Sequence, residues 1–163
     1  MQTPEPQEQH RWLHQLVGEW TFEHECNMGP DQPPMKCAGK QSTRALGELW
    51  IIGDITSSLP DGSPGQSVIT LGFDIARLKF VGTFIASCMT HLWPYEGSLD
   101  ASGKVLTLDS EGPSFSGDGT MARYQDIIEI LDRDHHTMTS RVQSADGTWT
   151  QFMHGTYCRS GAN

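Results

Sequence analysis

Two glutamates stand in short strings of aromatic and turn-forming residues, where neighbouring groups could hold a carboxylate in place. Glu96 lies in Trp-Pro-Tyr-Glu-Gly, and Glu111 lies in Ser-Glu-Gly-Pro. If both point into one cavity, each carboxylate raises the pKa of the other, and the two could act as a general acid and base pair. The structural alternative is that each accepts hydrogen bonds from a turn or pairs with an arginine at the rim.

A second pair of acids, Asp126 and Glu129, falls on opposite faces of an alternating apolar run from Tyr124 to Leu131. Whichever face is buried therefore carries a carboxylate. Because an unpaired buried carboxylate is costly, we expect an arginine beside it. The candidates are Arg44, Arg123 and Arg141. Such an arginine and carboxylate either form a structural ion pair or bind the polar head group of a ligand.

The histidines and cysteines do not have the spacing of a metal site. The seven histidines lack the His-Glu-x-x-His pattern, and the four cysteines include no Cys-x-x-Cys pair. We expect no metal and no cofactor. His24 and His154 are alternative axial ligands if a haem is bound, although a lone histidine among apolar residues is typical of a hydrogen-bonded core residue. The pair His135-His136 is predicted to lie in a turn.

Aromatic and sulfur-containing side chains indicate either a filled core or the wall of an apolar pocket. The pocket hypothesis assigns a ligand contact to residues of three kinds: apolar wall, histidine and polar anchor. The apolar wall consists of Trp20, Phe22, Trp50 and Met153, the histidine is His24, and the polar anchors are Arg44, Glu96 and Asp126.

Composition limits the partners of the 163-residue chain. Its 11 Lys and Arg against 20 Asp and Glu give a net charge of −9, which disfavours nucleic acid. There is no apolar run long enough to cross a membrane, and the polar segment from Met1 to Gln9 does not resemble a secretory signal. Cys26 and Cys37 could face each other across two strands, but we expect free thiols and a cytoplasmic location.

The elements that position these residues can be read from the hydrophobic period. Residues 7–17 place Trp12, Leu13, Leu16 and Val17 on one face of an amphipathic helix, and Gly18 is predicted to be its C-cap. From Glu19 the period changes to two. The predicted strands are 19–26, 36–47, 49–59, 67–74, 79–89, 91–99, 105–110, 120–131, 137–144 and 148–159.

Tight turns separate most of these strands, including Pro60–Ser63, Asp100–Gly103, Asp132–Asp134 and Ala145–Gly147. Strands joined by tight turns are antiparallel neighbours, and about ten twisted strands tend to close. The sequence therefore predicts a single domain over residues 1–163, an up-and-down β-barrel over about 19–159 with a short N-terminal helix. An open sheet around a long helix is the alternative.

Several strings resemble a known family. They include Gly18-Glu19-Trp20, Leu71-Gly72-Phe73-Asp74, Phe80-Val81-Gly82-Thr83-Phe84, Leu92 to Gly97, Leu106 to Pro113, Tyr124-Gln125-Asp126 and Trp149 to Met153. Together, over about His10 to Arg159, they are similar to the small bacterial proteins of domain of unknown function family 1579. The resemblance implies a calycin-like or lipocalin-like barrel and no particular catalytic residue.

Three functions follow from such a barrel. The first is binding of a small apolar or amphipathic molecule in the interior. The second is a cofactor-independent isomerase, cyclase or hydrolase that uses a barrel carboxylate, Glu96 or Glu111, as general base. The third is a structural or interaction protein with a packed barrel, which could form a homo-oligomer.

Overall fold

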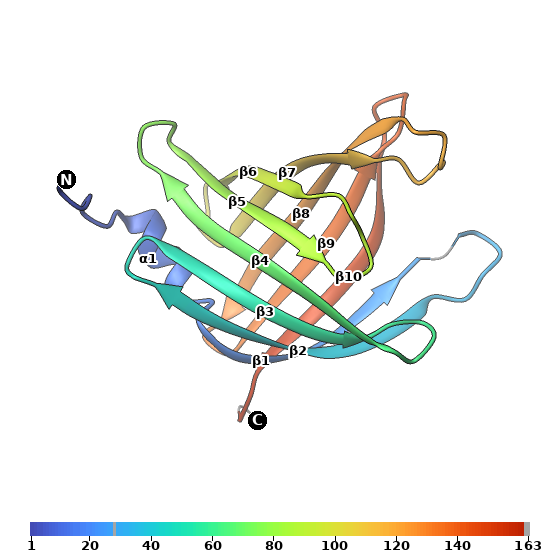
Figure 1. Ribbon diagram of the computed structural model, residues 1–163, viewed down its shortest axis with the longest axis horizontal. Helices are drawn as coiled ribbons and strands as arrows, with labels where there is room; N and C mark the ends of the chain where they lie inside the picture. The colour runs from blue at the N-terminus through green and yellow to red at the C-terminus, as the bar shows by residue number, and fades with distance from the viewer. Residues whose placement is uncertain (28, 162–163) are drawn as a thin grey trace.

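The computed structural model describes residues 1–27 and 29–161 and contains one short helix followed by ten strands (Figure 1). The elements, in chain order, are α1 (Glu8–His14), β1 (Gly18–Cys26), β2 (Met35–Leu46), β3 (Trp50–Ser58), β4 (Pro64–Asp74), β5 (Lys79–Ala86), β6 (Trp93–Leu99), β7 (Val105–Pro113), β8 (Met121–Asp132), β9 (His135–Gln143) and β10 (Trp149–Arg159).

Each strand pairs antiparallel with the next one in the chain, and β1 also pairs with β10, which closes the barrel. The predicted ten-stranded up-and-down barrel is confirmed, and the alternative of an open sheet is wrong. Predicted and observed strand ends differ by three residues or fewer. One prediction about a turn is wrong: the turn between β8 and β9 contains only Arg133 and Asp134, so His135 and His136 are the first residues of β9.

The helix is shorter than predicted because its last turn tightens. It ends at His14, and the amides of Leu16 and Val17 then donate to carbonyl oxygens three residues back, at 3.0 and 3.1 Å. Gly18 is therefore not the C-cap. It opens β1 with φ +132°, a backbone conformation that favours glycine, and a Cβ atom there would also lie 2.3 Å from Arg159 Nη1.

Helix α1 closes one end of the barrel (Figure 1). Trp12 Nε1 donates to the carbonyl oxygen of Gly103 at 2.6 Å, and His10 Nε2 hydrogen bonds to the carbonyl oxygen of Phe73 at 3.0 Å. Leu13 packs on the core of this end and is 1% exposed. The hairpins β1–β2, β3–β4, β7–β8 and β9–β10 lie at the opposite end, which has no helix over it in the described chain.

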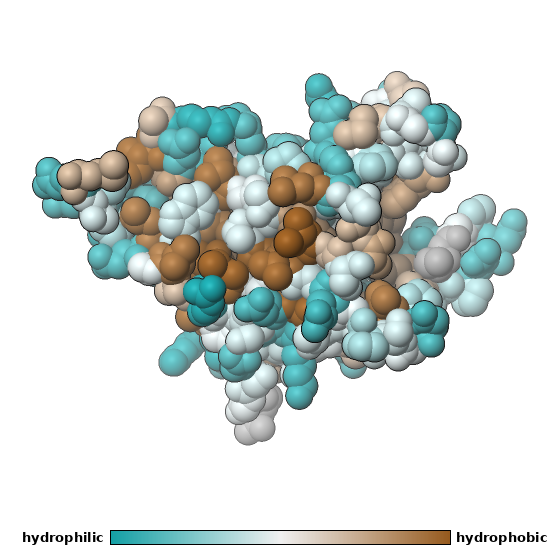
Figure 2. All heavy atoms as spheres, viewed as in Figure 1, coloured by the Kyte–Doolittle hydropathy of each residue, from teal (hydrophilic) through white to brown (hydrophobic). Residues whose placement is uncertain are grey.

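On the face seen in Figure 2, polar side chains lie around the rim and apolar side chains gather across the middle, over β3, β4 and β5. Trp50 and Ile85 are 39% and 47% exposed on these strands. Among residues 1–27 and 29–161, no helix combines the length and apolar character needed to cross a membrane.

Candidate binding site inside the barrel

The two halves of the barrel interior are filled differently. Strand alternation and register define the inward face. Next to α1, inward side chains such as Leu71, Phe80 and Leu106 are at most 2% exposed. In the open half, some inward side chains are half-buried and keep surface that a water-sized molecule can reach, whereas Tyr95, Ser140 and Tyr157 beside them are at most 5% exposed. The half-buried side chains include His24, Cys37, Phe84, Asp126 and Met153. The open half of the interior is therefore less completely buried than the half next to α1.

An acid projects into this half from β8. Asp126 lies opposite Leu108 of β7 and Ser140 of β9 in the register. The Ser140 hydroxyl donates a hydrogen bond to Asp126 Oδ1, and the Tyr95 hydroxyl, which comes from β6, donates to Oδ2. Ser140 and Tyr95 are 5% and 4% exposed. Both carboxylate oxygens are thus held by neutral donors from neighbouring inward positions.

The environment of Asp126 differs from the prediction. We expected an arginine, but among the described residues Asp126 forms no ion pair, because Arg44, Arg123 and Arg141 lie on the outer face. Burial raises the pKa of Asp126, and the hydrogen bonds from Ser140 and Tyr95 oppose this shift only in part. Burial, followed by the charge of Asp126, raises the pKa of Tyr95 well above its usual value.

A second polar pair faces the same space from β1 and β10. His24 Nε2 and the Tyr157 hydroxyl are hydrogen-bonded at 2.8 Å, and the His24 ring stacks on Phe22 with ring centroids 4.3 Å apart. Burial, assisted by His154, lowers the pKa of His24 to about 4, so this imidazole is neutral at neutral pH. Burial also raises the pKa of Tyr157, with Asp126 as the next cause, which links the two polar clusters.

Three buried polar atoms on the inward face have no hydrogen-bond partner in the described part of the chain. They are His136 Nδ1, Trp93 Nε1 and Ser110 Oγ. The His136 ring stacks on Tyr157 at a centroid distance of 4.4 Å, and burial lowers the pKa of His136 to about 4. Unpaired buried polar atoms are rare in folded proteins, and water or a ligand commonly satisfies them.

The structure separates the predicted ligand contacts into two groups. Trp20, Phe22, His24, Asp126 and Met153 point inward, although Trp20 lies near the plugged end and donates from Nε1 to the Leu16 carbonyl oxygen at 2.9 Å. Arg44, Trp50 and Glu96 lie on the outer face.

The carboxylates predicted to form an acid and base pair do not meet. Glu96 pairs with Arg77 and, at 3.3 Å, with Lys79, and its side chain is 44% exposed. Glu111 is also exposed on the outside, opposite Arg123 in the register. Neither points into the barrel.

Sequence reasoning missed several residues of the interior cluster, above all Tyr157, Ser140 and Ser110. Each of them alternates in step with the inward-facing residues of its strand, and this spacing was the only sign of its position in the sequence. A hydroxyl side chain occurs on buried and exposed faces alike, so it does not reveal which face of the strand is buried. Within the described ranges, no group of three or more His, Cys, Asp or Glu is arranged to hold a metal ion. A groove of about 630 Å³ lies beside α1 at the plugged end and is lined in part by Trp20 and Arg159, and a groove of about 640 Å³ lies across β1, β2 and β10.

These features define a closed ten-stranded meander barrel, plugged at one end, with a polar cluster inside its open half. The chain belongs to the family described as Protein of unknown function (DUF1579), whose model matches residues 5–159. The resemblance seen in the sequence is thereby confirmed. No curated protein matches the sequence.

Solved structures share the fold. Rv2717c from M. tuberculosis is 13% identical, with a TM-score of 0.63, and the match covers 96% of this chain and 99% of that one. The structure of EF1p2_mFAP2b bound to DFHBI is also 13% identical, with a TM-score of 0.50 and coverage of 93% and 98%. At these identities the likeness concerns the fold alone.

Proposed function

We propose that the protein binds a small, largely apolar molecule in the open half of its barrel and holds the polar end of that molecule at Asp126. The main observation is the Asp126 carboxylate, which lies inside the barrel with two neutral donors and with no cation beside it among residues 1–27 and 29–161. Such a group does not contribute to stability as an apolar residue would, so a role in recognition accounts for it. The half-buried inward side chains of the open half count against a packed barrel.

The charges of the interior narrow the ligand class. On the inward strand face of the described residues, the charged side chains are Asp126 and Arg159, and Arg159 lies at the plugged end over the Trp20 ring. An anionic head group would therefore meet a carboxylate and no cation. A neutral donor such as an alcohol, or a protonated amine, would find an acceptor. Phe84 and Met153 offer apolar surface to the rest of the molecule.

Support from the fold is general. A solved barrel with the same fold is bound to the small molecule DFHBI, so this architecture is compatible with small-molecule binding. The identity of the ligand follows from the chemistry of the interior and not from that likeness.

The test uses three probes with one body and different head groups: 4-phenylbutanol, 4-phenylbutylamine and 4-phenylbutyrate. At about ten times Kd, a ligand stabilises the folded state by about 1.4 kcal/mol, which raises Tm by about 3 to 5 °C in a domain of this size. We expect a rise with the alcohol and the amine and none with the carboxylate.

Two variants locate the effect. Asp126→Asn should weaken binding of the amine most, whereas Glu96→Gln removes the same charge from the outer face and should leave all three probes unchanged. A rise in Tm that is equal for the three probes, or equal in both variants, would argue against recognition at Asp126.

The same carboxylate favours a second candidate, a cofactor-independent enzyme that abstracts a proton from carbon. Burial raises the pKa of Asp126, as a general base working near neutral pH requires, and Tyr95 beside it could donate to a developing oxyanion. Ring opening of 5-nitrobenzisoxazole reports on such a base. Acceleration by the wild type that Asp126→Asn abolishes and Glu96→Gln retains would support the enzyme, and no acceleration would leave binding alone.

A further inference from the structure

A cysteine, a histidine and an aspartate meet on the outside of the barrel, where β8, β9 and β10 come together. Cys158 lies directly opposite His135 in the β10–β9 register, and His135 lies opposite Asp132 across the β8–β9 turn. Cys158, His135 and Asp132 all lie outside the inward-facing set that includes Tyr157 and His136. This group, which we call the Cys158 cluster, is separate from the interior site.

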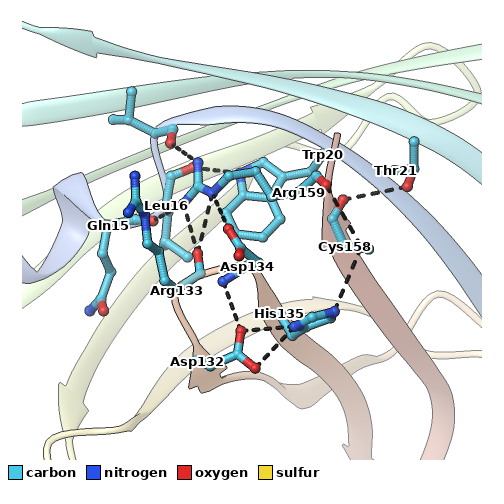
Figure 3. Close-up of polar contacts among 11 residues, drawn as sticks. Gln15, Leu16, Trp20, Thr21, Asp132, Arg133, Asp134, His135, Cys158 and Arg159 are labelled. Carbon is cyan, nitrogen blue, oxygen red and sulfur yellow. Dashed lines mark hydrogen bonds and ion pairs between the residues drawn. The ribbon is translucent and has the colours of Figure 1, made fainter. Parts of the chain in front are cut away.

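Donors and acceptors can be assigned to the contacts within the Cys158 cluster (Figure 3). His135 Nδ1 lies 2.8 and 3.0 Å from the two carboxylate oxygens of Asp132. A carboxylate only accepts, so Nδ1 carries the proton and donates it, and this hydrogen bond lowers the pKa of Asp132. Nε2 is then free to accept, and it lies 3.7 Å from Cys158 Sγ. The thiol's other contact is the carbonyl oxygen of Arg159, also at 3.7 Å.

The turn that carries this arrangement is held from several sides. The Asp134 amide donates to Asp132 Oδ1 at 2.8 Å, which fixes the carboxylate from behind. The Arg159 guanidinium donates to the carbonyl oxygen of Arg133 at 3.0 Å and pairs with Asp134 at 3.4 Å. Figure 3 shows these contacts converging on the turn below Trp20. The imidazole is therefore oriented by a braced hairpin.

Space for a reactant lies beside the thiol. The groove of about 640 Å³ across β1, β2 and β10 is lined by both His135 and Cys158. Thr21, Thr156, Glu23 and Lys40 also line it, so its charged groups are one acid and one base. A small molecule in this groove would have its reactive carbon within reach of Sγ without entering the barrel.

We propose that Cys158, His135 and Asp132 form a nucleophilic thiol site that accepts an acyl group from a small activated ester or thioester. The thiol proton moves to His135 Nε2 as Sγ bonds to the carbonyl carbon. The bond from that carbon to the ester oxygen or thioester sulfur breaks, and the leaving group takes the proton from His135. The products are S-acyl Cys158 and a free alcohol or thiol, with no change in oxidation state.

The other cysteines provide controls within the same molecule. Cys88, in the β5–β6 loop, is exposed, whereas Cys158 is half-buried. Accessibility alone therefore predicts that Cys88 reacts faster. Cys26 and Cys37 lie inside the barrel, where burial raises the pKa of both thiols, so they should react slowly.

The experiment treats the full chain with p-nitrophenyl acetate and maps acetylated cysteines by peptide mass spectrometry over time. We expect Cys158 to be acetylated at least about tenfold faster than Cys88. This is less than the roughly 10²- to 10⁴-fold effect of a positioned base in an enclosed active site, because the Cys158 cluster is partly exposed.

Variants of the Cys158 cluster test whether the Cys158 thiol reacts because His135 activates it or because it is exposed. His135→Gln should slow acetylation of Cys158 about tenfold and leave Cys88 unchanged, and Asp132→Asn, which keeps an acceptor for the Asp134 amide, should slow it less. An unchanged melting temperature confirms that each variant is folded. The proposal is overturned if Cys88 reacts as fast as Cys158 in the wild type, or if neither variant changes the ratio of the two rates. Both outcomes are independent of ligand binding in the barrel.

Discussion

Asp126 on β8 and Ser140 on β9 lie directly opposite each other in the strand register, and the Ser140 hydroxyl donates a hydrogen bond to Asp126 Oδ1. Tyr95 occupies the other carboxylate oxygen. Hydroxyl donors stabilise the ionised acid less than a cation would, so burial remains the dominant influence on this group. The site is thus suited to exchange a proton or to accept a hydrogen bond from a guest molecule.

Replacing Asp126 with Asn should change how stability depends on pH. Burial raises the pKa of Asp126, so above about pH 3.9 the unfolded chain releases a proton that the folded protein keeps. The free energy of unfolding contributed by this group therefore falls as pH rises toward the folded pKa. We expect the stability of Asp126→Asn, relative to wild type, to increase between pH 4 and pH 7 in urea denaturation. A difference that stays constant over this range would contradict a raised pKa.

His136 should change the pH dependence of stability in the direction opposite to Asp126, so that it destabilises the protein as pH falls. Burial lowers the pKa of His136 to about 4, whereas the unfolded imidazole titrates near about 6.5. Between these values the unfolded chain binds a proton that the folded protein does not, so stability falls as pH falls. The loss is on the order of 3 kcal/mol at pH 4. His136→Phe keeps a ring against Tyr157 and Trp20, and its urea midpoint should decline less steeply from pH 7 to pH 4. A parallel decline would mean that His136 does not titrate as its burial predicts.

The sequence allowed the barrel to be predicted more accurately than the direction in which individual side chains point. Trp20, Phe22 and His24 share a strand whose other face is acidic, so their inward phase could be predicted. Trp50 could not be placed in this way, because it packs outside on Gly72, where an added Cβ would lie 2.4 Å from the indole ring. That contact joins two strands and is invisible in either strand alone.

The same limit applies to the carboxylates. Glu96 was predicted to be an anchor from its aromatic neighbours, yet the register turns Tyr95 inward and Glu96 outward to Arg77. Asp126 lies on a strand with apolar residues on both faces, so the inward acid could not be chosen before the barrel was known. Closure of the barrel determines which residues of each strand face inward, and closure depends on all ten strands together.

Arg159 should be the main tie between the plug and the barrel. Its Nη1 donates to the carbonyl oxygen of Val17 at 2.7 Å, and its Nη2 donates to that of Gln15 at 3.1 Å. The guanidinium also lies 4.2 Å from the centroid of the Trp20 ring. Arg159→Met keeps the apolar stem and loses these interactions, which should cost about 2 to 3 kcal/mol in urea denaturation. Arg44→Met, on the exposed outer face, should change stability by less than about 0.5 kcal/mol. Equal effects of the two variants would show that the plug is held without Arg159.

Filling the open half of the interior should abolish binding without unfolding the barrel. Met153 is half-buried, points inward and lies opposite Ser140 beside the β-bulge of β10. Met153→Trp adds volume in the space that we assign to the ligand, and a partly filled interior can accept this at a cost of about 1 to 3 kcal/mol. We expect the variant to melt cooperatively and to lose the thermal shift with 4-phenylbutanol.

The matched control places the same residue outside the site. Met121 is the first residue of β8 and is 51% exposed, so Met121→Trp should retain the full shift. If Met153→Trp still responds to 4-phenylbutanol while Met121→Trp does not, the probe binds at the outer rim and not inside the barrel. If both variants respond as wild type does, the molecule occupies neither position. Asp126 would then have to be explained by proton transfer or by the architecture of the barrel itself.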